Sequence, residues 1–487
     1  MSDADIIIVG SGMGGATLAA GLAGSGLRVL IIERGQLLHD SPEARDPDAI
    51  FKRGHFRPDE TWLTPDGTRF NPGNYAYVGG NSKFYGAVMM RYREADFARH
   101  WPIDHATLAP FYTRAEGLFQ VRGDASIDPT EPPHDAPYPH PPIPHEADIA
   151  DLARRLKRAG LTPSPLPLAV DLDRWLSRGQ TPWDAHPDTN GGKLDAESAA
   201  LVAALDDPNI TLRTGVTVRR IESDGTRVTG LLTSAGRFTA PRIVIAAGAV
   251  HTAALLLTSA TEAHPNGLAN RSDQVGRNFM NHNASAVLAL SHRRNRAVYQ
   301  KTLQINDWYL DGLGNVQLLG RVSTPILAAQ TGLPKPVAAV IANRSIDFYA
   351  MSEDFPDPDS RVTIRGDDIV LDWKRSNWDA HLALVAKFKT TLRKAGFPIV
   401  LSKAFDRRTP SHQCGTARLG DDPTTSVCDP IGKAHDLENL YICDASLLPT
   451  SAAVNPSLTI AALALRQADH LKETSSSQAA EQKELVQ

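Results

Sequence analysis

The sequence predicts a mixed α/β fold with two domains, one built on a parallel sheet and one on an antiparallel sheet. The chain has 487 residues, more than a single hydrophobic core usually organises. Residues 5–35 and 243–258 each run from a buried strand through glycine into a helix, as parallel sheets require. Residues 286–375 instead alternate short apolar and polar runs, which is typical of antiparallel strands.

The N-terminal unit combines a buried strand with a glycine-rich turn. Ile6–Val9 is a continuous apolar run, as expected of a strand covered on both faces. Residues 10–15 read Gly-Ser-Gly-Met-Gly-Gly and open a helix of small residues that Gly24 and Gly26 end. Val29–Ile32 follows as the second strand. Because the glycine motif stands between a strand and a helix, it predicts a dinucleotide site.

The glycines of this motif have separate physical roles. Gly10 permits the turn, Gly12 lets the backbone approach a pyrophosphate, and Gly15 lets the helix pack close to the sheet. Free N–H groups at the helix start then stabilise the phosphate charge. Glu33 ends the second strand, where a carboxylate accepts hydrogen bonds from ribose hydroxyls and repels a 2′-phosphate. These residues leave NAD and FAD open and disfavour NADP.

The composition excludes several kinds of partner. Lys and Arg number 51 and Asp and Glu 55, so the net charge of −4 offers no basic surface for nucleic acid or anionic lipid. The 3 cysteines match neither a disulfide framework nor a zinc motif. The N-terminus lacks the basic start of an export signal, and Gly248 and His251 interrupt the apolar run 243–257. We therefore expect a cytoplasmic protein without a membrane span.

The middle of the chain alternates loops with strands. Residues 36–75 show no clear periodicity, and Gly79 and Gly80 open a tight segment. Residues 125–145 are rich in proline and contain histidines, and the prolines favour an extended connector over a metal site. Strands are expected at residues 210–213, 217–221, 228–233, 237–239 and 243–246, and a helix at 248–258.

The last third of the chain places polar residues at the ends of regular elements. Ala380–Ala395 is expected to be a helix, Asn439–Cys443 a strand and Leu458–Leu471 a closing helix. Residues 473–487 are polar and are predicted to be a mobile tail.

Three conspicuous polar groups occur in this part of the chain. His412 precedes a glycine turn, Asp444 follows the strand, and Asn455-Pro456 stands at the start of the closing helix. Asn and Pro are both favoured at helix starts, so a purely structural role for Asn455 is the simplest alternative.

The order and spacing of these residues resemble the glucose–methanol–choline (GMC) family of FAD-dependent oxidoreductases. The resemblance covers nearly the whole chain and favours FAD over NAD. It includes the glycine motif, Gly79-Gly80-Asn81-Ser82, Ala247-Gly248-Ala249 and Val275-Gly276-Arg277-Asn278. It implies a Rossmann-like FAD-binding domain assembled from residues 1–100, 195–285 and 405–472. Residues 101–194 and 286–404 would then form a substrate-binding domain with an antiparallel sheet.

The resemblance also implies which residues lie near the cofactor. Glu33 and Arg34 are expected at the adenosine, and Asp444 and Ala445 at the pyrophosphate and ribityl chain. The full set expected to contact FAD is Gly10, Gly12, Met13, Gly14, Gly15, Glu33, Arg34, Gly79, Gly80, Asn81, Ser82, Phe84, Val218, Gly248, Asp444, Ala445, Asn455, Pro456 and Thr459.

By the same resemblance, His412 and Asn455 are the expected catalytic pair. Oxidising an alcohol removes the hydroxyl proton and a hydride from carbon. A neutral His412 can accept the proton, and the Asn455 amide can donate a hydrogen bond to the developing alkoxide. Proximity to flavin N5 would then direct the hydride.

Two neighbouring positions depart from the family pattern. Phe84 stands where some relatives carry a histidine that attaches FAD covalently, so we predict non-covalent FAD. Tyr85 follows where the family often has Asn, and its ring is expected either to line the flavin face and the substrate or simply to pack.

The substrate prediction rests on residues 304–309 and on the family. Gln304, Asn306 and Trp308 combine an aromatic ring with amides, as sugar sites often do, although an ordinary half-buried strand is the alternative. We expect a sugar, glycoside or polyol as substrate and a quinone, a redox protein or O2 as electron acceptor, with a dehydrogenase favoured over an oxidase by family analogy. A non-redox flavin-containing lyase and an inert flavin-binding component are the other readings.

Overall fold

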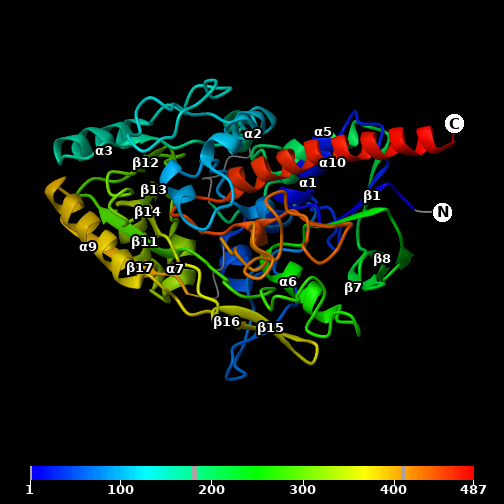
Figure 1. Ribbon diagram of the computed structural model, residues 1–487. Coiled ribbons are helices and arrows are strands. Elements are labelled where there is room, and N and C mark those ends of the chain that lie inside the picture. The colour runs from blue at the N-terminus through cyan, green and yellow to red at the C-terminus, as the bar shows by residue number, and fades with distance from the viewer. Residues whose placement is uncertain (1–2, 178–183, 407–411, 487) are drawn as a thin grey trace.

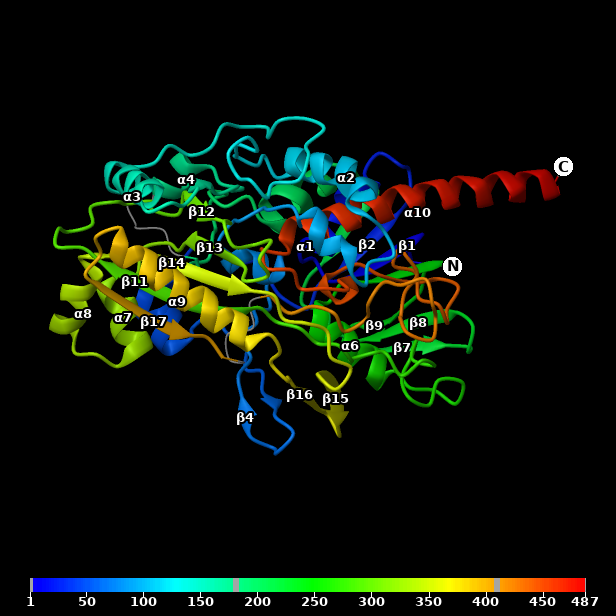
Figure 2. The same ribbon diagram turned by 60° about the vertical axis from the view of Figure 1, so that its left-hand side comes forward.

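The protein is described by a computed structural model that covers residues 3–177, 184–406 and 412–486. The predicted domain segments also include residues 1–2, 178–183, 407–411 and 487, which lie outside the described residues. The elements form a mixed α/β fold with several sheets, as predicted (Figures 1 and 2).

A parallel sheet of five strands forms one half of the molecule. All neighbouring strands in it are parallel, and most of their residues are buried because helices cover the sheet. In spatial order the strands are β18 (Leu440–Ile442), β10 (Arg242–Ile245), β1 (Ile6–Val9), β2 (Val29–Ile32) and β6 (Ile210–Arg213).

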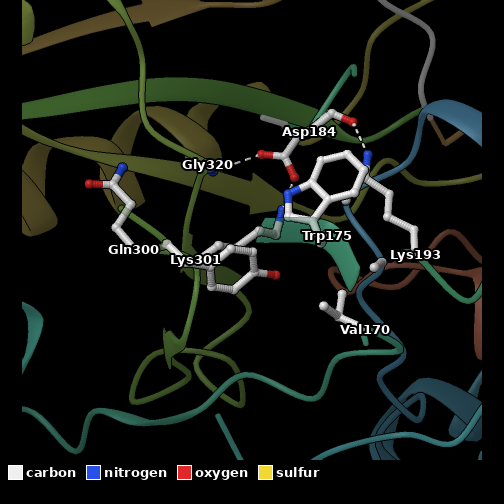
Figure 3. Close-up of a pocket in the computed structure, with 10 residues that line it drawn as sticks. Val170, Trp175, Asp184, Lys193, Gln300, Lys301 and Gly320 are labelled. Carbon is white, nitrogen blue, oxygen red and sulfur yellow. Dashed lines mark hydrogen bonds and ion pairs between the residues drawn. The ribbon is translucent and has the colours of Figure 1, made fainter. Parts of the chain in front are cut away.

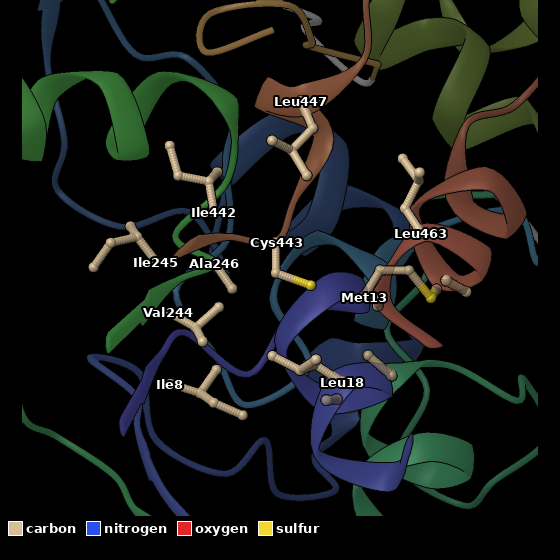
Figure 4. Packing of buried hydrophobic residues seen from close by; sticks show 14 of the residues in the cluster. Ile8, Met13, Leu18, Val244, Ile245, Ala246, Ile442, Cys443, Leu447 and Leu463 are labelled. Atoms are coloured by element: carbon tan, nitrogen blue, oxygen red, sulfur yellow. The ribbon is translucent and has the colours of Figure 1, made fainter. Parts of the chain in front are cut away.

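The helices α1 (Met13–Leu22) and α10 (Ser457–Val486) pack against each other beside this sheet. Figure 4 shows Leu18 and Leu463 from these helices in one core with Ile8 and Val244 from the strands. Close packing of this kind explains why α1 is built from Gly and Ala.

The last helix differs from its prediction. α10 continues through Val486, although residues 473–487 were expected to form a mobile tail, and its C-terminal end projects from the rest of the molecule (Figures 1 and 2). Residues 478–485 are Ala, Gln, Glu, Lys and Leu, all good helix formers, so local propensity can continue a helix that tertiary contacts begin.

A second sheet has six antiparallel strands. In spatial order they are β17 (Ile399–Ala404), β11 (Asn283–Leu290), β14 (Ser345–Ser352), β13 (Asn315–Leu318), β12 (Leu303–Ile305) and β5 (Ser164–Pro165). The helices α3 (Ala147–Arg158) and α9 (Trp378–Lys394) share a hydrophobic core with one face of this sheet. Since side chains alternate along a strand, the other face is free to carry the polar residues described below.

Two small sheets complete the strands. One contains β15 (Arg361–Arg365), β16 (Asp368–Asp372), β3 (Trp62–Leu63) and β4 (Arg69–Phe70), and the other β7 (Val218–Ser223), β8 (Val228–Thr233) and β9 (Gly236–Phe238). The remaining helices are α2 (His105–Leu118), α4 (Leu172–Leu176), α5 (Val202–Leu205), α6 (Ala249–Thr258), α7 (Thr324–Thr331) and α8 (Lys335–Ala342). Short 3₁₀ or π turns span Pro42–Arg45, Asp48–Arg53, Gly80–Phe84, Glu94–Ala98, Ala196–Leu201 and Ala445–Leu447.

Part of the predicted antiparallel region is helical instead. α7 and α8 lie within residues 286–375, which the alternating pattern assigned to strands. Both helices are short and have proline in their first turn, a start signal that outweighs a weak alternation of apolar residues.

Several contacts between elements cross the domain division expected from the sequence. All five strands of the parallel sheet come from the segments assigned to the cofactor domain. However, α2 packs on α10, and β3 pairs with β16. The division into a cofactor domain and a substrate domain therefore stays a prediction. No described helix has an apolar stretch long enough to cross a membrane.

Candidate active site

The glycine-rich turn leaves room for a ligand at one position only. Gly10 has φ +105°, a conformation that favours glycine. A Cβ at Gly14 would lie 1.8 Å from the Cys443 carbonyl oxygen, and one at Gly15 would lie 2.1 Å from that of Gly10. At Gly12 a Cβ would meet nothing within 4 Å. Gly14 and Gly15 thus serve packing, whereas Gly12 borders an open cradle at the start of α1.

A second glycine turn lies against this cradle. A Cβ at Gly80 would be 3.5 Å from the Gly12 Cα, and the Gly79 N–H donates to the Ser11 hydroxyl over 3.2 Å. Ser82 fixes the turn, since its hydroxyl donates to the Gly79 carbonyl over 2.6 Å and accepts from the Ala196 N–H over 3.1 Å. The side-chain oxygen of Asn81 accepts from the N–H of Tyr75. The two glycine turns that the sequence assigned to one cofactor are therefore adjacent in space.

The carboxylate of Glu33 already has protein partners. It accepts hydrogen bonds from the Ser11 N–H and hydroxyl, at 2.9 and 2.8 Å, and from the Gly35 N–H at 2.7 Å. It lies at the end of β2, as predicted, and stabilises the glycine turn. Arg34 is exposed and forms an ion pair with Glu60 over 3.3 Å.

Asp444 joins the last strand to the rest of the site. Its carboxylate accepts from the Gly248 N–H at 2.9 Å, from the Thr252 hydroxyl, and from the N–H and hydroxyl of Ser446. Burial raises the pKa of Asp444 despite these bonds. The side chain therefore organises the start of α6 and the turn Ala445–Leu447, close to the glycine cradle.

The remaining residues predicted at the cofactor lie at element starts. Met13 is the first residue of α1, Val218 the first of β7, and Pro456 directly precedes α10. Thr459 is fully buried, and its hydroxyl pairs with the Tyr112 hydroxyl over 2.8 Å. Only the backbone of Thr459 is left for a ligand.

His412 and Asn455 meet, although 43 positions separate them in the chain. The Nδ2 atom of Asn455 lies 3.3 Å from the Nε2 atom of His412. Gln317, from β13, donates its amide hydrogen to the Asn455 side-chain oxygen over 3.1 Å. This bond orients the Asn455 amide, so its NH2 group points to the imidazole. The Asn455 side chain thus has partners on both its oxygen and its nitrogen outside α10.

A second histidine lies behind His412. The Nδ1 atoms of His282 and His412 are 2.7 Å apart, and the Asn281 side-chain oxygen accepts from the His412 backbone N–H. Burial holds the pKa of His412 well below its usual range, and the neighbouring His282 and Lys301 act in the same direction. His412 is therefore neutral near pH 7, the form that accepts a proton.

The His412 turn and the glycine cradle share one support. The Gly415 N–H, three residues after His412, donates to the Ala445 carbonyl over 3.1 Å. The neighbouring carbonyl of Cys443 is the atom against which Gly14 packs. The turn that follows His412 and the glycine turn at the start of α1 therefore both contact residues 443–445.

Sequence analysis missed three residues of this cluster. Asn281, His282 and Gln317 touch His412 or Asn455, but the first two directly precede β11 and Gln317 belongs to β13. The polar run Asn281-His282-Asn283 between Met280 and Ala284 was the available signal, since such residues in an apolar stretch require partners. Gln317 had no comparable signal.

The proposed substrate residues 304–308 lie in two different environments. Trp308 packs with Val316 and Phe388 in the core under α9, so the structure does not bring it to the site. Gln304 pairs with Gln317 across β12 and β13 and so lies on the other face. Its amide and that of Asn306 are directed to Asp128, within a buried polar network.

The two positions that depart from the family pattern are both packed. Phe84 is buried and stacks on Tyr75, with ring centroids 3.6 Å apart. A phenyl ring therefore occupies the position at which some relatives carry a histidine. The hydroxyl of Tyr85 donates to the Leu194 carbonyl over 2.7 Å.

A small pocket is lined by residues that include Gly86 and Ala87, directly after Tyr85 (Figure 3). Its polar lining includes the ion pair between Asp184 and Lys301, and the Gly320 N–H donates to Asp184 over 3.0 Å. Lys193 lies 4.6 Å above the Trp175 ring and donates to the Tyr85 carbonyl, and burial lowers the pKa of Lys193 to about 8.

The histidines of the proline-rich tract do not gather into a metal site. His134 contacts Glu131, His140 contacts Gln120, and His145 contacts Thr302. The described residues contain no group of three or more His, Cys, Asp or Glu side chains arranged to hold a metal ion.

Comparison with known proteins agrees with this geometry. Family models described as GMC oxidoreductase match residues 166–284 and 356–464, and a model described as an NAD(P)-binding Rossmann-like domain matches residues 8–54. Paromamine 6'-oxidase from Streptomyces fradiae is 30% identical over 95% of this chain and 90% of its own length. The chain belongs to the GMC oxidoreductase family. It is therefore an oxidoreductase.

Other GMC relatives are similar over comparable lengths. The fructose dehydrogenase large subunit of Gluconobacter japonicus is 26% identical over 96% of this chain and 97% of its own length. Among solved structures, pyridoxine 4-oxidase from Mesorbium loti has a TM-score of 0.67 and 21% identity and covers 96% of this chain and 99% of its own. An FAD-dependent oxidoreductase from Chaetomium thermophilum has a TM-score of 0.68 and 14% identity and covers 97% of this chain and 100% of its own. These likenesses confirm the predicted fold class.

Proposed function

We propose that this GMC oxidoreductase uses non-covalent FAD to oxidise a hydroxyl group of a sugar, glycoside or polyol to a carbonyl, with an external electron acceptor. The observation that carries the proposal is the 3.3 Å contact between His412 Nε2 and Asn455 Nδ2 in a chain that also contains an open glycine cradle. An imidazole beside an amide donor is the arrangement that removing a hydroxyl proton requires.

The residues present fit FAD. The open space at Gly12, the free N–H groups at the start of α1 and the adjacent Gly80 turn suit a pyrophosphate. Phe84 provides no atom that could bond covalently to the cofactor, which supports a dissociable FAD. When bound, the flavin supplies a hydride acceptor at N5.

Protein groups handle the hydroxyl. Neutral His412 takes the hydroxyl proton, and the second N–H of Asn455 donates to the oxygen as negative charge develops on it. Within the part of the chain that the structure describes, the buried side-chain oxygen of Gln317 has no hydrogen-bond partner. A second hydroxyl of the substrate would supply the missing donor, which would favour vicinal diols and sugars over simple alcohols.

The names of relatives support the same substrate class. By their names, two of the relatives act on paromamine and on fructose.

An anaerobic substrate screen tests the proposal. The purified protein is loaded with FAD and mixed, without oxygen, with sugars, glycosides, polyols and simple alcohols while its visible absorption is followed. Bleaching by a hydroxyl-rich compound is expected, and O2 or a quinone is then added to identify the acceptor. Bound flavin that stays oxidised with every alcohol, or lyase activity on a cyanohydrin without bleaching, contradicts the proposal.

A further inference from the structure

One hydrogen bond joins the imidazole rings of His282 and His412 through their Nδ1 atoms. The Nδ1 atoms of His282 and His412 are 2.7 Å apart, and the rings meet edge to face with centroids 4.7 Å apart. A hydrogen bond needs one donor and one acceptor, so one of these nitrogens carries hydrogen and the other is bare. The question is which histidine donates.

The carbonyl group of Ser451 shows which of the two histidines is the donor. The Nε2 atom of His282 lies 2.9 Å from the Ser451 carbonyl oxygen, which can only accept. Nε2 of His282 therefore carries hydrogen. His282 is only 4% exposed, and burial lowers its pKa to about 4, so it is neutral near pH 7 and has a single ring hydrogen. Its Nδ1 is then bare and accepts from the Nδ1–H of His412.

The groups on the other side of His412 agree with this assignment. With hydrogen on Nδ1, neutral His412 has a bare Nε2, and this atom faces the NH2 group of Asn455. Gln317 independently orients that amide through the Asn455 oxygen. A chain of four hydrogen bonds therefore runs in one direction, from Gln317 through Asn455, His412 and His282 to the Ser451 carbonyl. Bonds aligned in this way polarise one another and strengthen.

We propose that His282 is a positioning residue that holds His412 in the tautomer with a bare Nε2, whose lone pair accepts from Asn455 here and takes the proton when a substrate hydroxyl replaces that contact. The other tautomer would place hydrogen on Nε2, opposite the Asn455 NH2 group, and would have no lone pair for the hydroxyl. The consequence for catalysis rests on the proposed function, but the tautomer itself does not.

The tautomer can be measured without any substrate. Nitrogen NMR of protein labelled with ¹⁵N-histidine distinguishes the protonated ring nitrogen from the bare one, and the His412→Gln variant identifies the His412 signals. We expect the His412 hydrogen on Nδ1 at neutral pH, with or without FAD. A His412 hydrogen on Nε2 overturns the proposal.

Two substitutions at His282 separate positioning from packing. In Asn the amide oxygen is attached to Cγ, as Nδ1 is in histidine, so His282→Asn can still accept from His412 but no longer reaches Ser451. His282→Gln keeps the contact with Ser451, because its amide group extends to the position of Nε2, but it no longer accepts from His412. A purely structural role predicts that Gln is tolerated better, since it keeps the volume and the Ser451 contact. The proposal predicts the opposite.

The rates and the tautomer should change together. His282→Gln should reduce the rate of flavin reduction by the best alcohol about tenfold to a hundredfold more than His282→Asn does, with KM little affected. It should also move hydrogen onto Nε2 of His412. An unchanged tautomer in His282→Gln, or a rate above that of His282→Asn, overturns the proposal. If no alcohol reduces the flavin but the wild-type tautomer is as stated, the proposed function fails and the assignment stands.

Discussion

At the scale of single residues, the site depends on how each polar group is oriented. The sequence identified His412 and Asn455 through the family resemblance of the segment that contains them. It missed Gln317 and His282, which orient them, because contacts between separate strands leave no local pattern in the sequence. Trp308 was expected at the substrate because aromatic side chains are common in sugar sites. Strand alternation and the turn after β12 instead direct its ring into the core.

The depressed pKa of His412 leads to a pH prediction. His412 must be neutral to accept a proton, and burial, His282 and Lys301 all lower its pKa. The rate of flavin reduction should therefore stay level down to about pH 6.5, the usual histidine pKa, and fall only at lower pH. Rapid mixing at a series of pH values measures it.

A variant near His412 provides the control. Lys301→Met removes a positive charge and leaves the Asp184 carboxylate unpaired, so the decline on the acid side should move to higher pH. A wild-type decline centred above about pH 7, or no movement in Lys301→Met, contradicts this account of the electrostatics.

At the scale of elements, the glycine turn allows a matched pair of substitutions. Gly12→Ala adds a methyl group to open space at φ −70°, so the apoprotein should fold normally while FAD binds at least about tenfold more weakly. Gly14→Ala places its methyl group on the Cys443 carbonyl and should destabilise the fold by about 1–3 kcal/mol or more. FAD titration and urea unfolding of both apoproteins measure these effects, and equal losses of stability would be inconsistent with the packing described.

The contact of α9 with the antiparallel sheet contains a pH-sensitive group. His381 is fully buried, its ring nitrogens contact the hydroxyls of Ser285 and Ser352 at 2.8 and 3.1 Å, and burial lowers its pKa to about 4. An unfolded chain protonates this histidine below about pH 6.5, so the stability it gives is present above that pH and declines as the pH falls toward 4.

Comparison with a variant isolates this effect from the other titrating groups. His381→Gln should be less stable than wild type at pH 7, and the difference should shrink by about 2 kcal/mol at pH 4.5. Urea unfolding at the two pH values tests it. A difference that stays constant or grows on acidification excludes a neutral, buried His381.

Elements differ in how far the sequence determines them. The strands of the parallel sheet were predictable, because burial on both faces produces unbroken apolar runs such as Ile6–Val9. α7 and α8 were not, because short helices with alternating apolar residues look like strands until tertiary packing against β11 is known. The C-terminal half of α10 was mistaken for a tail because its residues lack a periodic apolar face.

At the scale of the whole molecule, the site lies where the two large sheets approach each other. Gln317 belongs to the antiparallel sheet, and Asn455 precedes the helix that packs on α1 beside the parallel sheet. The Asp444 carboxylate and the Gly415–Ala445 contact link the same region to α6. The sequence indicated the members of each half through the family resemblance, but not how closely the halves would meet.

The central claim is that His412 takes the proton from an alcohol beside a bound flavin. The most direct test compares wild type with His412→Ala after confirming equal FAD content, by mixing each anaerobically with the best alcohol of the screen. We expect the flavin of the wild type to bleach and that of the variant to bleach at least about a hundredfold more slowly. Bleaching of both proteins at similar rates would contradict the account.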